Sequence, residues 1–398
     1  MKKLFLSTIA MYVMLLSAHS QNTDTTVYES KPLQLEEINL VSSYYTQTGD
    51  HSAVTGGIGT ETVKDFSNGL DLQFVGWDDN KRKHTITAGL GFDYHTSASS
   101  AFVSKTGASK TGGTRIYPSL NWSMENPAKG TGIGAGLYYS SEYNYHSFGM
   151  ETEYSKKTHS NGEFSAKLNA FFDKVTLIYP SELRPATVVV SSASSSGSSV
   201  PKSPRNTVSG SFSFSQVFNK RMQGSITMDL VEQGGYLGLP FHRVYFTNGL
   251  EFVENLPANR FKLPIGARFN YFIGDRVILR AYYRYYVDDW GLTAHTASLE
   301  MPVKLTPFFS VAPFFRYYTQ TAARYFAPYK EHSASDMYYT SNYEYSAFNS
   351  NYFGVNIRIA PPDGLFKSKL SSLEIRYGHY TQTTDLLSDV LSLEFKFK

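Results

Sequence analysis

The chain of 398 residues contains no cysteine and carries 37 lysines and arginines against 34 aspartates and glutamates. Without cysteine it has no disulfide, no lipidated cysteine and no thiolate metal site, and its near-neutral balance gives no general attraction to nucleic acid. It is polar on average, with a mean hydropathy of −0.30, yet it holds 30 tyrosines and 28 phenylalanines.

The first twenty residues predict a secretory signal peptide. Lys2 and Lys3 precede an apolar run at 4–16, and small residues lead up to Gln21. A basic start, a short apolar core and small residues before the cut are the three parts of such a signal. The apolar run is too short to span a membrane, and no later run reaches the length of a transmembrane helix. We therefore expect residues 1–20 to be removed and 21–398 to form one domain.

Further along, apolar and polar residues alternate in many stretches. In 84–96 and 163–178, for example, every second residue is apolar. In 276–288 three arginines fall on one side of the alternation, and only apolar or aromatic residues fall on the other. Period two is the pattern of a strand. Many such stretches of about ten residues predict an outer-membrane barrel, where alternate residues face lipid.

The connections support the same fold. Links such as DDNKRK, NPAKG and NKR are short and rich in turn residues, and they alternate with long loops. The sequence thus predicts an all-β protein, an antiparallel transmembrane β-barrel of about sixteen strands with short periplasmic turns and long extracellular loops. The strands are expected near 33–46, 68–77, 84–96, 113–124, 131–141, 144–157, 163–178, 207–218, 222–232, 261–272, 276–287, 292–304, 308–319, 351–360, 369–381 and 388–397. Pro118, Pro264, Pro302 and Pro313 count against their strands unless they lie at ends or bulges.

The last strand carries a second signal. Leu391, Leu393, Phe395 and Phe397 alternate with polar residues. An alternating terminal strand that ends in aromatics resembles the sorting signal of outer-membrane barrels, although Lys398 rather than an aromatic is the final residue. We expect residence in the cell outer membrane, with outer-membrane lipid and the barrel assembly machinery as partners.

The inward-facing charges divide into two groups along the chain. Charges that face lipid cost roughly 2–4 kcal/mol at mid-membrane, so they gather inside. The expected acidic lining is Asp71, Asp93, Glu151, Glu153, Asp173 and Asp229. The expected basic lining is Arg268, Arg276, Arg280, Arg284, Arg316, Arg358 and Arg376. In a closed cylinder these groups face each other, which favours a porin-like channel for small polar or charged solutes; the alternative is a filled barrel whose charges pair and which conducts nothing.

The sequence contains only weak matches to the motifs of enzymes. Gly56-Gly57-Ile58-Gly59 looks like a phosphate-cradling loop, but no Lys-Ser/Thr pair follows it and the site would be extracellular, so a flexible loop is favoured. His295 and Ser298 fall on opposite sides of a strand and should not form a nucleophile–base pair; His295 is expected in the outer interfacial belt beside Trp290. No histidine spacing suggests a metal. The sequence therefore assigns no catalytic, cofactor-binding or metal residue, and it predicts neither an enzyme nor a cofactor.

Two loops differ in composition. Segment 188–204 is of low complexity and is expected to be a mobile outer loop. Segment 320–350 holds eight tyrosines and phenylalanines and is too aromatic for a solvated tail. It packs across the barrel mouth or binds a partner, and the sequence leaves both open.

Several motifs resemble those of one uncharacterised family. They are DHSAVTGGIGTE (50–61), GYLGLPFHRVYF (235–246), YRYYVDDWGLTAHTASLE (283–300) and RYYTQTAARYF (316–326). The family is a domain-of-unknown-function group of bacterial outer-membrane proteins. Its members look to be encoded beside a small lipoprotein, a thioredoxin-like protein and an enzyme that attaches flavin to exported proteins. The resemblance implies a second function, a non-conducting scaffold or export partner for envelope redox proteins.

Overall fold

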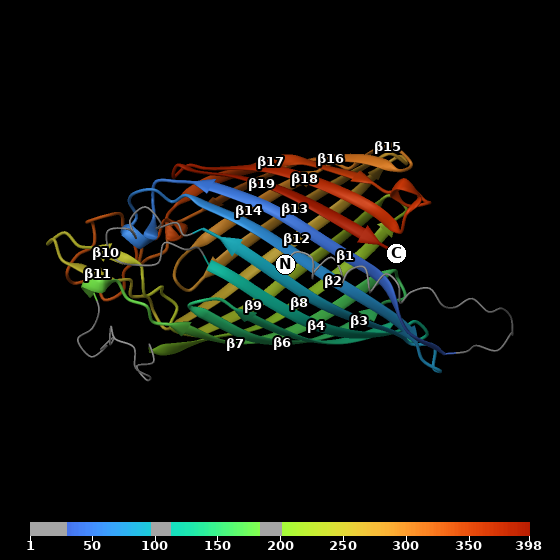
Figure 1. Ribbon diagram of the computed structural model, residues 1–398, viewed down its shortest axis with the longest axis horizontal. Helices are drawn as coiled ribbons and strands as arrows, with labels where there is room; N and C mark the ends of the chain where they lie inside the picture. The colour runs from blue at the N-terminus through green and yellow to red at the C-terminus, as the bar shows by residue number, and fades with distance from the viewer. Residues whose placement is uncertain (1–29, 97–112, 184–200) are drawn as a thin grey trace, which may run out of the picture.

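The computed structural model describes residues 30–96, 113–183 and 201–398. Within them the chain forms a closed antiparallel barrel, because each wall strand pairs with the next and β1 pairs with β19. Figure 1 shows the cylinder from the side, with strongly tilted strands. The predicted all-β barrel is confirmed. The predicted signal peptide, 1–20, lies outside the described residues and stays a prediction.

The wall strands follow one another around the cylinder in chain order. They are β1 (Lys31–Thr48), β2 (Val63–Trp77), β3 (Lys83–His95), β4 (Gly113–Asn126), β5 (Thr131–Ser141), β6 (Tyr145–Lys157), β7 (Gly162–Thr176), β8 (Lys202–Asn219), β9 (Met222–Gly235), β12 (Asn259–Ile273), β13 (Val277–Asp288), β14 (Thr293–Glu300), β15 (Val303–Thr306), β16 (Phe309–Gln320), β17 (Phe348–Ile359), β18 (Leu370–Gln382) and β19 (Leu386–Phe397). A separate hairpin is formed by β10 (Arg243–Tyr245) and β11 (Glu251–Val253).

The prolines lie where the ladder of hydrogen bonds is interrupted. Pro302 separates β14 from β15, two parts of one strand, so the described segments make sixteen strands. Pro313 lies beside that break, where the β14–β16 pairing ends. Pairing also skips Pro264 between β12 and β9, and Pro118 between β4 and β5. Proline has no backbone N–H to donate, so a gap in the ladder is where a strand tolerates it.

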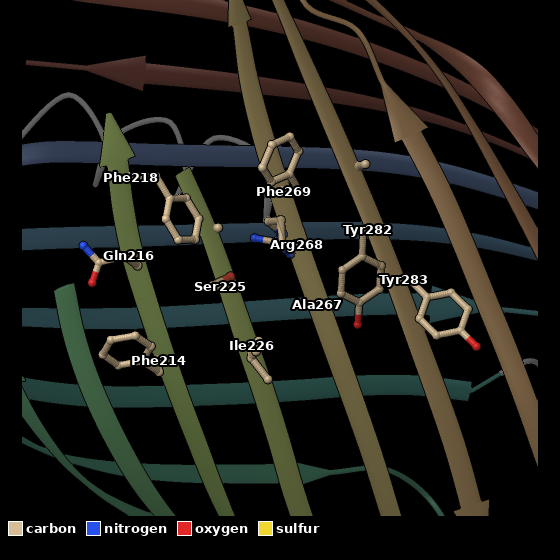
Figure 2. Close-up of a pocket in the computed structure, with 12 residues that line it drawn as sticks. Phe214, Gln216, Phe218, Ser225, Ile226, Ala267, Arg268, Phe269, Tyr282 and Tyr283 are labelled. Carbon is tan, nitrogen blue, oxygen red and sulfur yellow. The ribbon is translucent and has the colours of Figure 1, made fainter. Parts of the chain in front are cut away.

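The alternation sorts side chains between the two faces of the wall. On β13, Leu279 and Tyr283 point outward, whereas Arg280 and Arg284 point into the cylinder. Figure 2 shows the outward face at β8, β9 and β12, where aromatic side chains stand on neighbouring strands. A groove of about 500 Å³ runs between them over small residues, and it is lined largely by apolar side chains. This is the face that lipid contacts in barrels of this kind.

The two ends of the barrel differ. One end carries short connections, such as 220–221, 274–276 and 307–308, together with the end of β19. We call it the short-turn end. The other, the long-loop end, carries 49–62, 236–258 and 321–347. Figure 1 shows the β10–β11 hairpin at this end and the C-terminus at the opposite one. No helix among the described residues has the length and apolar character needed to cross a bilayer.

Candidate functional site

Six of the predicted basic residues lie on inward-facing positions of the wall. Cross-strand register places Arg268 opposite Tyr282, and Tyr282 opposite Ser298. Ser298 in turn lies opposite Arg316, so the two arginines belong to one inward-facing row across β12, β13, β14 and β16. The other four are Arg280, Arg284, Arg358 and Arg376. These six form what we call the basic arc.

Three of the six arginines are paired with carboxylates. Arg280 Nη1 lies 2.7 Å from Glu300 Oε1, and Arg376 Nη1 lies 3.6 Å from the other oxygen of the same glutamate. Arg358 Nε lies 2.9 Å from Glu374 Oε1. Glu300 thus carries one negative charge for two arginines, Arg280 and Arg376. Glu374 neutralises Arg358. The basic arc therefore carries less net charge than its sequence suggests.

Arg268, Arg284 and Arg316 have no carboxylate within ion-pair distance in the part of the chain that the structure describes. Arg268 lies over the ring of Tyr282, 5.5 Å from its centre, and Arg316 lies over Tyr352 at 4.9 Å. A guanidinium stacked on an aromatic face keeps its N–H groups at its edge, available to solvent or solute. These three arginines hold most of the uncompensated positive charge of the arc, and the rest lies on the two arginines that share Glu300.

Arg276 departs from the prediction. It lies in the turn 274–276 before β13, exposed at the short-turn end, and not in the wall. The alternation of odd and even positions grouped Arg276 with Arg280 and Arg284. This alternation does not show where a strand begins. Arg280 lies in the wall, in the half of β13 that is nearer the short-turn end.

The predicted acidic residues also lie on inward-facing positions, on β2 to β9. Glu151 and Glu153 share one cation, since Lys167 Nζ lies 3.2 Å from the first carboxylate and 3.7 Å from the second. Asp93 accepts a hydrogen bond of 2.8 Å from Tyr117. Asp71 lies opposite Gly89 and Asp229 lies opposite Ser211 on neighbouring strands.

Asp173 differs from the other acidic residues. It points inward near the long-loop end, but it is only 6% exposed and accepts a hydrogen bond from Tyr145. Its second oxygen has no hydrogen-bond partner among the described atoms. Arg205 lies opposite it on β8 but donates to the carbonyls of Tyr236 and Gly238 instead. Asp173 is therefore a packed group beneath the outer loops and not a water-exposed wall residue.

Three long loops meet over the mouth of the barrel, and we call segments 49–62, 236–258 and 321–347 the cap. The first leaves the wall between β1 and β2, and the second between β9 and β12, eight strands away in either direction. These points are on opposite sides of a cylinder that is about 30 Å across at ordinary strand tilt and spacing. The third leaves between β16 and β17. Contacts between the three segments therefore extend across the mouth.

Those contacts are specific. Arg243 Nη1 of the second segment donates to the Val54 carbonyl of the first at 2.8 Å, and its Nε donates to Glu182 at 2.6 Å. The rings of His51 and Tyr343 stack with centres 3.7 Å apart, which joins the first segment to the third. The second and third segments are joined by two backbone hydrogen bonds between Asn255 and Tyr339. Loop 320–350 was expected to pack across the mouth or to bind a partner, and the structure shows it packed.

Several of the most deeply buried side chains among the described residues lie in the cap. They include Val244, Phe246, His332, Thr340 and Ser341, each at most 2% exposed. Most wall side chains, by contrast, face either lipid or the lumen. Apolar burial stabilises by about 25 cal/mol per Å², so the cap has a small core of its own.

Trp290 belongs to this core and corrects another expectation. It is 2% exposed, packs against Tyr325 and Tyr345, and lies 4.3 Å from the guanidinium of Arg260. It is therefore not in an interfacial belt beside His295. His295 does face outward, where its Nδ1 lies 2.7 Å from the Tyr283 hydroxyl. Ser298 points inward, so the two residues do not meet.

Gly56 and Gly57 are not parts of a flexible loop. Both are buried and have φ of +83°, a left-handed conformation that favours glycine. A Cβ at Gly56 would come within 2.6 Å of the Tyr245 ring, and one at Gly57 within 2.6 Å of the Ser341 carbonyl. The glycines let the first cap segment approach the other two closely, which explains the motif without a phosphate.

Beneath the cap lies a buried ion pair that sequence reasoning missed. Arg260 Nε and Nη2 lie 3.0 and 2.5 Å from Asp288 Oδ2, and Tyr286 donates to the same oxygen at 2.8 Å. Arg260, like Arg268, has an even number and so falls on the same side of the alternation. The predicted strand, 261–272, began one residue too late to include it. Arg205 was missed for the same reason, since β8 begins at Lys202 inside the segment that was expected to be mobile.

One cap carboxylate has a strongly altered proton affinity. Burial raises the pKa of Glu61 to about 7, with Glu344 of the third segment raising it further and His242 lowering it. Glu61 is held through its backbone, whose N–H donates to the Gly49 carbonyl at 2.7 Å. Its protonation therefore changes the charge at the junction of all three cap segments near neutral pH.

A family model described as protein of unknown function (DUF3570) matches residues 109–386. The chain belongs to this family. No curated protein sequence matches the chain. The closed barrel, with an apolar outer face and a polar inner one, is the architecture of an outer-membrane β-barrel.

Solved barrels show a general likeness. OpdQ of Pseudomonas aeruginosa is 8% identical, covers 93% of this chain and 99% of its own, and has a TM-score of 0.43. OccD3 (OpdP) of the same organism is 7% identical over 94% of this chain and 95% of its own, with a TM-score of 0.44. A bacterial polysaccharide outer membrane secretin is 10% identical over 91% and 98%, also with 0.44. At such scores no residue of this chain acquires a role from these proteins.

Proposed function

We propose that the protein is an outer-membrane channel for small polar or charged solutes, with a cap across its outer mouth. Its basic arc faces an acidic arc, which consists of Asp71, Asp93, Glu151, Glu153 and Asp229 on β2 to β9. The short-turn end lies in the periplasm and the cap outside the cell, as is usual for barrels of this kind. Outer-membrane lipid surrounds the wall, and the barrel assembly machinery inserts it after the signal peptide is removed.

The main support for this proposal is the solvent exposure of charged side chains that point into the barrel. Arg280 and Arg358 point into the cylinder, yet 49% and 50% of their side-chain surface is open to solvent. If side chains filled the barrel, these groups would be buried, and a buried charge is costly unless it is fully paired. Their exposure supports a lumen that holds water, as expected for a barrel of this strand number.

The charge pattern supports a preference among solutes. Arg268, Arg284 and Arg316 lie on one side of the lumen, and Asp71 and Asp93 lie on β2 and β3 of the other side. Asp229 lies on β9, where the acidic strands adjoin β12. Opposed arcs give a transverse field that orients dipolar solutes, while mobile ions are attracted to the wall of opposite sign. The paired residues Arg280, Arg358 and Arg376 shape the wall but add less to the field.

Planar-bilayer recording of the purified protein tests the proposal. We expect discrete conductance steps and an ion selectivity that responds to changes in the basic arc. A correctly folded barrel, verified by heat-modifiable gel migration, that passes no ions under any condition would contradict it.

The cap favours a second candidate function. Loops that converge from opposite sides of the mouth suit a non-conducting scaffold or export partner for envelope redox proteins as well as a channel. This candidate predicts co-purification of periplasmic flavin-linked or thioredoxin-like proteins with the barrel, together with the absence of conductance.

A further inference from the structure

A chain of buried polar groups joins the second and third cap segments. His332 is 2% exposed, and both of its ring nitrogens lie near acceptors. Nδ1 is 3.2 Å from Asp336 Oδ2, and Nε2 is 3.0 Å from the Thr340 carbonyl. The Thr340 hydroxyl then donates to Glu254 Oε1 at 2.5 Å, which reaches the second segment.

The two contacts of His332 differ in how well each charge state of the ring satisfies them. A neutral imidazole has one N–H and can donate to only one partner, whereas the imidazolium has two. A carboxylate and a carbonyl both accept and cannot donate. Both contacts are therefore hydrogen bonds only when His332 is protonated. Loss of that proton leaves one nitrogen facing an acceptor, in a site with almost no water to replace the lost bond.

Backbone bonds place this histidine at the junction itself. The Thr247 N–H donates to the His332 carbonyl at 3.0 Å, and Phe246 pairs with His332 in a parallel bridge. The ring of His332 also contacts Phe246 and Tyr339. A change in the charge of His332 therefore acts on the contact between two loops that leave the wall at different points of the rim.

The other titratable groups at this junction act in the same direction. Glu254 is buried, accepts from the Leu239 N–H at 2.7 Å, and lies 3.7 Å from His242 Nδ1, which has no hydrogen-bond partner among the described atoms. Protonated His242 would therefore gain attraction to Glu254. From the first segment Glu61 faces Glu344, which its ionised form repels, and His242, which it attracts; burial leaves the ionised form disfavoured overall. The other charged residues of the third segment are Arg324, Lys330, Glu331 and Asp336.

We propose that the junction of His332, Asp336, Thr340 and Glu254 is a proton-dependent latch, which holds the cap together when His332 is protonated and loosens it as pH rises. Histidine is the side chain suited to a change between about pH 5 and 8. The latch rests on the proposed function only for its consequence, a wider outer mouth at higher pH. Loosening of the cap can be measured without any assumption about conduction.

The test uses single cysteines in this naturally cysteine-free chain. Ser341, 1% exposed in the cap, and exposed Ser335 are each replaced by cysteine in otherwise wild-type protein. The labelling rate at 341 divided by that at 335 cancels the effect of pH on thiol reactivity. From about pH 5 to about pH 8 we expect this ratio to rise about tenfold, the scale of losing one hydrogen bond to a charged group. An unchanged ratio overturns the latch.

Two variants give opposite results. His332→Gln removes the titrating charge, so the ratio is expected to be high already at about pH 5, with only the shallower pH dependence that Glu61 contributes. Asp336→Asn supplies an amide N–H to Nδ1, so neutral His332 can satisfy both contacts, and the ratio stays low with the same shallow dependence. His295→Gln, on the lipid face, keeps the wild-type response. Heat-modifiable migration verifies that each barrel is folded. If both His332→Gln and Asp336→Asn retain the wild-type pH response, His332 is not the latch.

The outcomes separate this inference from the channel proposal. A pH-dependent ratio in a protein that never conducts supports the latch and removes the channel. Conductance with a pH-independent ratio supports the channel and removes the latch.

Discussion

Arg243 Nη1 donates to the carbonyl of Val54 at 2.8 Å, although the two residues belong to loops that leave the barrel on opposite sides. The same guanidinium lies 2.6 Å from Glu182, in the connection between β7 and β8. One buried side chain thus ties three separate points of the rim. An arginine can do so because its planar fork donates several hydrogen bonds in fixed directions.

Replacing Arg243 with methionine should release the cap while leaving the wall intact. The Val54 carbonyl and the partly exposed Glu182 carboxylate would each lose a donor. A buried acceptor left without a partner costs about 1–3 kcal/mol, and here the cost is confined to the loops. Limited proteolysis should cut 236–258 or 321–347 much faster, with unchanged heat-modifiable migration. Arg221→Met, in an exposed turn at the other end, is the matched control. Equal protease resistance of the two variants would contradict the assigned role of Arg243.

Glu61 should make cap stability fall with rising pH. Its pKa in the folded protein is about 7, above the ordinary 4.5, because burial disfavours the charged form. A carboxyl with a raised pKa is most favourable while protonated, so its contribution is full below its ordinary pKa and is lost as pH rises through about 7. Glu61→Gln should therefore make the pH dependence of cap proteolysis shallower. A steeper dependence in this variant would reverse the sign of the argument.

Ion selectivity should depend on the unpaired arginines and not on the paired ones. Arg284→Ser combined with Arg316→Ser should shift the reversal potential toward cation selectivity, with little loss of stability, since neither side chain neutralises a carboxylate. Glu300→Gln should shift it toward anions, because Arg280 and Arg376 both lose their shared partner. Shifts of the same sign in the two variants would exclude a selective basic arc.

Cysteine labelling on intact cells should give the orientation. Ser335→Cys lies in the cap and should react with an impermeant maleimide, whereas Asn126→Cys, at the short-turn end of β4, should not. Outer-membrane fractionation should recover both variants. Labelling of Asn126→Cys alone would place the cap in the periplasm.

The wall was predictable because its pattern is local. Alternation in 84–96 or 276–288 records directly which face meets lipid, and the turn-rich links set the strand count. The predicted strand ends were wrong. The predicted strands began after Arg205 and after Arg260, which belong to β8 and β12, whereas another included Arg276, which lies in a turn. A one-residue extension leaves the alternation unchanged, so the pattern contains no information about where pairing stops.

The cap was not predictable by the same means. Its core forms between segments that are far apart in the sequence, and it has no period that would mark Phe246 or Thr340 as buried. The aromatic content of 320–350 indicated packing but not the partner. Trp290 was read as an interfacial residue because interfacial belts are where tryptophan is common in barrels, whereas the cap gives it a buried site over Arg260.

The meeting of 49–62 with 236–258 sets an order of events during biogenesis. Eight strands separate their exits in either direction, so the two loops come within reach of each other only when the sheet has curled and β1 has found β19. Contacts between residues so far apart in the sequence form late, because the intervening chain must first lose its conformational entropy. The loops around Arg243 should therefore become protease-resistant only when the barrel closes. The time at which this resistance appears reports when closure occurs during insertion.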